Sequence, residues 1–183
     1  ISRARLAVQY PASFMLVASM NPCPCGYHNH PEKECVCAPG VVQKYLNRIS
    51  GPLLDRIDIH IEVTPVPINE LTEDRNGEVS EEVRKRVINA RNVQTKRFAE
   101  SNGVHANAQM SSKQLKELCE IDDAGRELLK TAADRLGLSA RAFDRILKVS
   151  RTIADLAGKQ NIETSHLAEA IQYRSLDRDS WAG

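Results

Sequence analysis

Four of the five cysteines lie close together in the sequence and have the spacing of metal ligands. They form two pairs, Cys23-Pro-Cys25 and Cys35-Val-Cys37, separated by nine residues. Two thiolate pairs joined by a short loop suit a tetrahedral zinc ion, because the loop can carry the second pair across the metal. Four thiolates leave no open coordination position. The pattern therefore predicts a structural zinc ion and not a catalytic one.

Two other interpretations of this segment stay open. The Cys-x-Cys spacing is tighter than the usual Cys-x-x-Cys, and a reducing cytosol would keep the same loop as free thiols without disulfides. His28 or His30 could also replace one thiolate, although four cysteines already complete the coordination shell. Cys119 stands apart, and we expect it in a hydrophobic core.

Around this segment, two apolar patterns predict β-strands. Residues 14–18 form a continuous apolar run, which is typical of a parallel strand buried on both faces. From Ile57 to Val63, isoleucine or valine alternates with polar residues, which predicts a strand with one buried face. A short helix is expected between them, over residues 41–49.

Helical periodicity dominates after residue 80. Residues 65–80 contain prolines and an Asn-Gly pair and are predicted to be a linker. Capping signals include Ser111 with Gln114, Ser139, Gly137 and Gly158. The expected helices cover residues 81–101, 112–119, 123–136, 140–157 and 165–174. The predicted fold class is therefore α/β followed by α, with the helices packed as one bundle.

The amino-acid composition excludes only a few classes of function. The chain has 183 residues, 27% of them charged, and a formal net charge of +1. This balance lacks the basic excess of a dedicated nucleic-acid binder, so contact with a polyanion must come from local patches. No apolar run approaches the roughly 20 residues needed to span a bilayer. We therefore expect a cytoplasmic protein without membrane contact.

Three segments carry a resemblance to a known family: PASFMLVASMNPCPCG, ISGPLLDRIDIHIEV and LSARAFDRILKVSRTIADLAG. In this order they resemble the Mg-chelatase-like AAA+ ATPases, in particular the competence-associated ComM/YifB group. The resemblance implies that residues 1–64 form the C-terminal half of an AAA+ parallel-sheet core with a Cys-rich insertion, and residues 81–183 its helical lid. It also implies that the Walker A and B motifs lie before Ile1, since no Gly-x-x-x-x-Gly-Lys-Ser/Thr pattern occurs here.

The resemblance assigns a role to three polar residues. Asn21, after the first predicted strand, matches sensor 1, which orients the attacking water; otherwise it only begins a turn before Pro22. Arg56 matches the arginine finger that reaches the ATP of a neighbouring subunit; otherwise it forms a surface ion pair with Asp55 or Asp58. Arg141 matches sensor 2 and contacts the nucleotide phosphates; otherwise it is a solvated arginine at a helix start, where the dipole disfavours it.

The implied protein is a ring-forming homo-oligomer, with a hexamer expected, that uses ATP and Mg²⁺ to remodel branched DNA during recombination or competence. This chain is expected to be inactive without the upstream motifs. One alternative is a magnesium chelatase subunit that couples ATP hydrolysis to Mg²⁺ insertion into a porphyrin, although the resemblance links the cysteine loop to the competence group. Another is a non-catalytic, zinc-stabilised interaction module.

Overall fold

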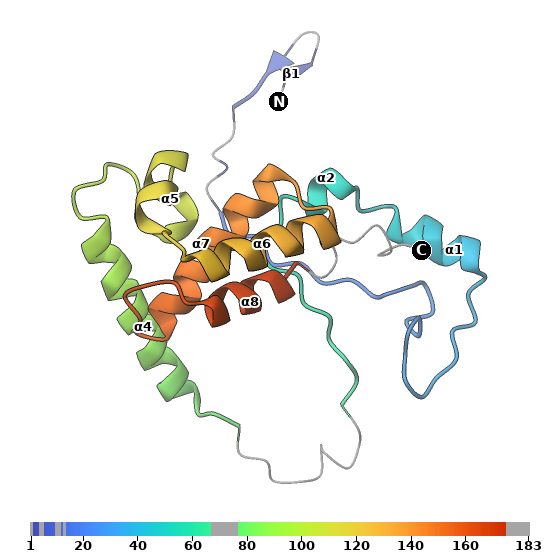
Figure 1. Cartoon of the computed structure of the whole chain (residues 1–183). Helices are drawn as coiled ribbons and strands as arrows, with labels where there is room; N and C mark the ends of the chain where they lie inside the picture. The colour runs from blue at the N-terminus through green and yellow to red at the C-terminus, as the bar shows by residue number, and fades with distance from the viewer. Residues whose placement is uncertain (1, 4–5, 10–11, 13, 67–76, 175–183) are drawn as a thin grey trace.

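The computed structural model describes residues 2–3, 6–9, 12, 14–66 and 77–174, and most of the regular structure there is helical (Figure 1). Two short antiparallel strands of two residues each come first, β1 (Ser2–Arg3) and β2 (Leu6–Ala7). The helices are α1 (Pro39–Leu46), α2 (Gly51–Leu54), α4 (Ser80–Arg97), the 3₁₀ turn η1 (Asn107–Gln109), α5 (Ser112–Leu118), α6 (Asp123–Leu136), α7 (Ala140–Leu156) and α8 (Thr164–Gln172).

The helices after residue 79 surround α7. Helix α7 contacts α4, η1, α5 and α8, and α8 also packs against α6 (Figure 1). Apolar residues on α7 recur every three to four positions, so one face of the helix is buried along its length. The core includes Leu129, Ile146, Ala154 and Leu167, all fully buried, together with Phe98 and the predicted core residue Cys119. This bundle confirms the predicted C-terminal helical domain.

Local sequence signals fix where several of these helices begin and end. The Ser111 hydroxyl accepts a hydrogen bond from Gln114 N, and Gln114 Oε1 accepts one from Ser111 N, as the capping box predicted. Gly137 ends α6 in the left-handed region, with φ of 61°. Helix α8 begins at Thr164, directly after its N-cap residue Glu163.

A buried ionic network joins α4, η1 and α7. The Asp155 carboxylate, which is completely buried, accepts hydrogen bonds from Arg97 at 2.6 and 2.7 Å and from the Asn107 amide at 2.8 Å. Arg151 donates to the same carboxylate at 3.1 Å and to the carbonyls of Lys159 and Gln160. Because every partner comes from a different turn or helix, the network fixes α4 and the loop after α7 against the bundle.

The two predicted strands are not formed among the described residues, so the sheet half of the predicted fold class is not shown and stays a prediction. Residues 14–18 have no strand partner within the described part of the chain, and Phe14 and Val17 are 75% and 83% exposed. In residues 57–63 the expected alternation of burial is absent: Ile61 and Val63 are exposed, and His60 is the one buried residue of the segment. A strand needs a neighbouring ladder to satisfy its backbone, and the described residues offer these segments none. The parallel sheet is therefore absent from the described part of the chain.

His60 attaches the 57–63 segment to the bundle instead. Its backbone N–H donates to the Tyr173 carbonyl just after α8, at 2.8 Å, and its Nε2 lies 3.2 Å from the Leu54 carbonyl. Residues 67–76 of the predicted linker and residues 175–183 lie outside the described residues. The predicted domain boundaries therefore stay a prediction, although α4 begins at Ser80, close to the expected start of the lid. In the part of the chain described, no helix has the length and apolarity needed to cross a bilayer.

Candidate functional site

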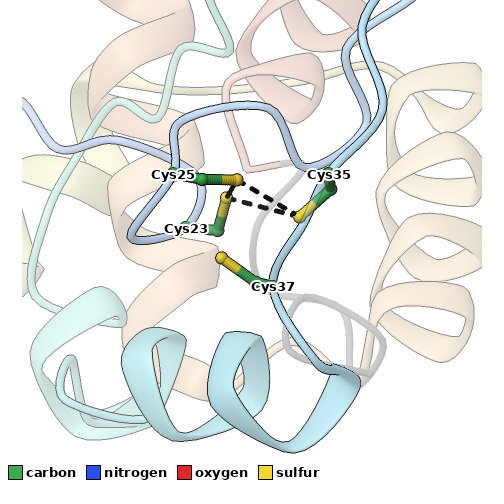
Figure 2. A group of neighbouring side chains, drawn as sticks. All are labelled: Cys23, Cys25, Cys35 and Cys37. Atoms are coloured by element: carbon green, nitrogen blue, oxygen red, sulfur yellow. Dashed lines mark hydrogen bonds between the residues drawn. The ribbon is translucent and has the colours of Figure 1, made fainter.

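The four cysteines of the sequence motif come together in the structure (Figure 2). The Cys23 and Cys25 sulfurs are 3.3 Å apart, and the Cys35 sulfur lies 3.7 Å from the first and 3.5 Å from the second. Cys37 points toward the same centre, and all four sulfurs lie within 4.8 Å of one another (Figure 2). Four sulfurs about 2.3 Å from a tetrahedral zinc ion would be separated by roughly 3.8 Å. The observed spacing therefore fits a zinc ion with little rearrangement.

The surrounding chain holds these thiols in place. Gly26 adopts φ of 84° in a turn closed by its own N–H donating to the Cys23 carbonyl, which folds the first pair back on itself. The His28 N–H donates to the Cys23 sulfur at 3.3 Å. Cys23 is fully buried against Val42 and Leu46 of α1, in a small core separate from that of the helical bundle. The loop and α1 thus form one local unit.

The thiols differ in acidity. The pKa of Cys25 is lowered to about 6, mainly because the Tyr27 backbone N–H favours the thiolate. At Cys35 the Cys37 backbone N–H acts in the same direction, but burial and the neighbouring thiols outweigh it and raise the pKa to about 12. Several thiolates cannot share this small space without a cation, because each raises the pKa of the next. A divalent metal would remove that conflict.

The histidines of the loop take structural positions. His30 Nδ1 accepts hydrogen bonds from the backbone N–H groups of Glu32 and Lys33, both at 3.1 Å, and so closes a turn. The metal-ligand cluster among the described residues consists of the four cysteines, without His28 or His30. This arrangement favours the four-cysteine prediction over a site in which a histidine replaces a thiolate.

The predicted arginine finger lies directly after α2. Arg56 is exposed, and its Nη1 donates to the Pro52 carbonyl at 2.6 Å. The alternative interpretation of Arg56 was an ion pair with Asp55 or Asp58, but these carboxylates have other partners. Arg56 therefore stays an exposed residue whose hydrogen-bond partner among the described residues is a backbone carbonyl and not a carboxylate.

Asp55 instead binds the start of α7. Its carboxylate accepts a 2.8 Å hydrogen bond from the Ser139 hydroxyl and lies 3.4 Å from Arg141 Nη1. The Ser139 oxygen also accepts from Ala142 N at 3.1 Å, which confirms its predicted capping of α7. Arg56 follows Asp55 directly in the chain, and Arg141, 85 positions after Arg56, lies 3.4 Å from the Asp55 carboxylate. The structure therefore brings the predicted finger and the predicted sensor 2 residue into one region.

Asn21 is not part of this arrangement. It is exposed, two residues before Cys23, and among the described residues no hydrogen bond or ion pair joins it to Arg56 or Arg141. Its predicted position followed from a buried strand at residues 14–18, which is not formed here.

Sequence reasoning missed most of the neighbours of the two arginines. Arg145 pairs with Asp58, and the buried Arg174 donates to the Ile57 carbonyl and lies 3.8 Å from Asp55. Arg145 follows Arg141 by one helical turn, and this spacing was the available signal. Nothing in the local sequence marks Arg174, because its partners are more than 100 residues away.

Two family models match the chain. One, described as magnesium chelatase subunit ChlI C-terminal, matches residues 77–174, and the other, described as magnesium chelatase subunit ChlI, matches residues 1–71. The chain belongs to the magnesium chelatase ChlI family. The boundary between the two matches falls within the segment 65–80 that the sequence predicted to be a linker.

Individual relatives place this magnesium chelatase family member in the ComM/YifB group. It is 46% identical over 180 residues to competence protein ComM of Haemophilus influenzae, an alignment that covers 97% of this chain and 34% of that protein. It is 40% identical over 179 residues to YifB of Escherichia coli, with the same two coverages. The chain thus spans about a third of the length of these relatives.

Proposed function

We propose that this chain is the C-terminal part of a ring-forming AAA+ ATPase and that it completes the nucleotide site of a neighbouring subunit. The observation that carries the proposal is the contact between Arg141 and Asp55, the residue that precedes the exposed Arg56 in the chain. Membership of the magnesium chelatase family supports the ATPase assignment, with ATP and Mg²⁺ as its cofactors. In the longer protein, residues 1–64 would complete the AAA+ sheet core and residues 81–183 would form the lid.

The chemistry required of the two arginines is stabilisation of charge. During hydrolysis, water attacks the γ-phosphorus, the bond to the β–γ bridging oxygen breaks, and negative charge builds up on the phosphoryl oxygens. A guanidinium offers planar, paired donors to such oxygens and stays protonated throughout. Arginine fingers are worth about 10³- to 10⁵-fold in rate. Arg56 would act as the finger, and Arg141 would hold the phosphates of the same nucleotide.

The position of the arginines supports action between subunits. The 183-residue sequence has no Gly-x-x-x-x-Gly-Lys-Ser/Thr loop, so the phosphates would be held by another segment of the longer protein. Both arginines are exposed, and a surface cluster can reach a nucleotide bound to an adjacent copy. We therefore propose a homo-oligomeric ring, with six subunits as the expected number, and a cytoplasmic location.

Two further roles belong to the first 64 residues. Asn21 would orient the attacking water once the segment 14–18 joins a sheet in the longer protein. The four cysteines would hold a structural zinc ion that fixes their loop against α1; their sulfur geometry supports this role.

We propose branched DNA as the substrate of the full-length ring. The support is the identity to a protein named for competence, together with the resemblance of the three sequence motifs. A second candidate function, Mg²⁺ insertion into a porphyrin, is favoured by the descriptions of the two matching family models. The cysteine cluster and the ComM likeness lead us to prefer DNA.

ATP hydrolysis by the full-length protein tests this proposal, measured with branched DNA, with a porphyrin and with neither. We expect stimulation by branched DNA and its loss in Arg56→Ala, with ATP binding retained. Arg91→Ala is the matched control, because Arg91 is an exposed arginine of α4 away from the cluster. Stimulation by porphyrin alone would favour the chelatase. A full-length protein without hydrolysis under any condition would favour the interaction module.

A further inference from the structure

Arginine outnumbers aspartate where residues 55–58 meet α7 and the end of α8. Arg141 and Arg174 lie 3.4 and 3.8 Å from the Asp55 carboxylate, and Arg145 pairs with Asp58. Arg56 is close enough for its positive charge to lower the pKa of Arg145. Three guanidinium groups thus contact two carboxylates and a fourth lies nearby, which leaves a local excess of two positive charges.

Within this cluster Arg145 is a partly buried cation with one donor that no acceptor among the described residues uses. Its side chain is only 25% exposed, and its Nη1 donates to Asp58. Its Nε is shielded from solvent and has no hydrogen-bond partner within the described part of the chain. An N–H group left without an acceptor in a buried position costs free energy, and the cost rises when the group is charged. Arg145 therefore has an unused donor beside other cations.

The electrostatic surroundings of Arg145 favour an additional anion. Burial lowers the pKa of Arg145, and the nearby positive charges of Arg174 and Arg56 lower it further, against the opposing effect of Asp55. The guanidinium nevertheless stays protonated at neutral pH. An anion that entered the cluster would relieve the repulsion between these cations.

Asp58 occupies the place that such an anion would take. Its side chain is 49% exposed, so the carboxylate keeps much of its hydration and can return to water when Arg145 is released. Carboxylate and phosphate oxygens are both acceptors for the guanidinium fork, and a phosphate brings more charge and more acceptor oxygens. The exchange therefore replaces one monodentate contact with a contact that can also use Nε.

We propose that Arg145 is a third phosphate-contacting residue of this site and that Asp58 holds it until the phosphate arrives. The inference rests on the proposed function, because the phosphate is that of the nucleotide bound by a neighbouring subunit. Asp58 thereby acts as an internal counter-ion that competes with the ligand. Removal of its charge should strengthen phosphate binding, and the gain should depend on Arg145.

The test uses inorganic tripolyphosphate and the 183-residue chain in isothermal titration calorimetry. We expect Asp58→Asn to bind about tenfold more tightly than the unaltered chain, as the loss of one competing charge-assisted hydrogen bond implies. Arg145→Gln should bind more weakly, and the double variant Asp58→Asn/Arg145→Gln should match Arg145→Gln. Asp134→Asn, at an exposed position of α6, is the matched control and should not change the affinity.

If Asp58→Asn still raises the affinity for tripolyphosphate when Arg145 is replaced, the effect comes only from the change in net charge, and the proposal is overturned. The absence of measurable tripolyphosphate binding by every variant would also overturn it. If Arg145→Gln does not fold, as judged by circular dichroism, Arg145→Lys replaces it, because lysine keeps the charge but lacks the Nε donor. This binding assay is independent of the hydrolysis assay with Arg56→Ala. The inference can therefore fail while the proposed function survives, and the two failures are distinguishable.

Discussion

The Asp55 carboxylate accepts a 2.8 Å hydrogen bond from the Ser139 hydroxyl, across 84 positions of sequence. This bond ties the turn that presents Arg56 to the residue that caps α7 and precedes Arg141. Arg56 follows Asp55 in the chain, and Arg141 lies two residues after Ser139. The relative position of the two arginines therefore depends on this bond.

The first prediction concerns the coupling of Asp55 and Ser139. Asp55→Asn and Ser139→Ala should each lower the free energy of unfolding by about 1 to 2 kcal/mol, since one removes a charged acceptor and the other also removes a helix cap. The double variant should lose less than the sum, with a coupling energy of at least about 0.5 kcal/mol. Urea unfolding of the four proteins measures this cycle. Strictly additive effects would show that the bond does not form in solution.

The second prediction concerns the buried carboxylate of Asp155. Asp155→Asn should lower the free energy of unfolding by about 3 kcal/mol or more at pH 7, because it leaves the charges of Arg97 and Arg151 without a counter-ion. The same substitution at exposed Asp134 should change it by less than about 0.5 kcal/mol. Chemical unfolding followed by circular dichroism gives both values. Equal effects at the two positions would contradict the buried network.

The same carboxylate predicts a pH dependence. Although burial alone raises the pKa of Asp155, hydrogen bonds from Arg97 and Asn107 outweigh it, and the net pKa lies below its usual value. The stabilisation is therefore fully present above the pKa of an unfolded aspartate, about 4, and is lost as the pH falls through the lower folded-state value. Asp155→Asn should lose less stability than the unaltered chain between about pH 5 and pH 2, as measured by urea unfolding at each pH.

The fourth prediction concerns zinc. The purified chain should contain about one equivalent of zinc, and Cys25→Ser or Cys35→Ser should lose it, whereas Cys119→Ala in the other core should retain it. Because the cysteine loop packs only with α1 in its own small core, chelation should expose the amides of residues 23–46 to hydrogen exchange and leave those of α6 to α8 protected. Metal-free protein with an ordered loop would exclude the site.

The sequence predicted the helices well because their signals are local. Apolar periodicity and caps such as Ser111, Ser139 and Gly137 operate within one or two turns, so the predicted α6 agrees with the structure over residues 123–136. The cysteine cluster was equally accessible, because its ligands lie close together in the sequence.

The strands and the arginine neighbours could not be predicted in the same way. A strand depends on a ladder that another segment supplies, and residues 14–18 and 57–63 have no such ladder among the described residues. The pairing of Asp58 with Arg145 spans 87 positions, and the bond from Arg174 to Ile57 spans 117. Only the packing of α7 and α8 brings these groups together, and no local pattern encodes it.

A mixing experiment with the full-length protein tests whether these arginines act on the nucleotide of a neighbouring subunit. One variant carries Arg56→Ala, and the other has a disabled phosphate-binding loop and an intact Arg56. Neither should hydrolyse ATP alone, but mixed rings should recover part of the activity, because some interfaces then pair an intact loop with an intact finger. Mixed rings that stay inactive, or Arg56→Ala rings that hydrolyse ATP normally, would show that Arg56 does not act on the nucleotide of a neighbouring subunit.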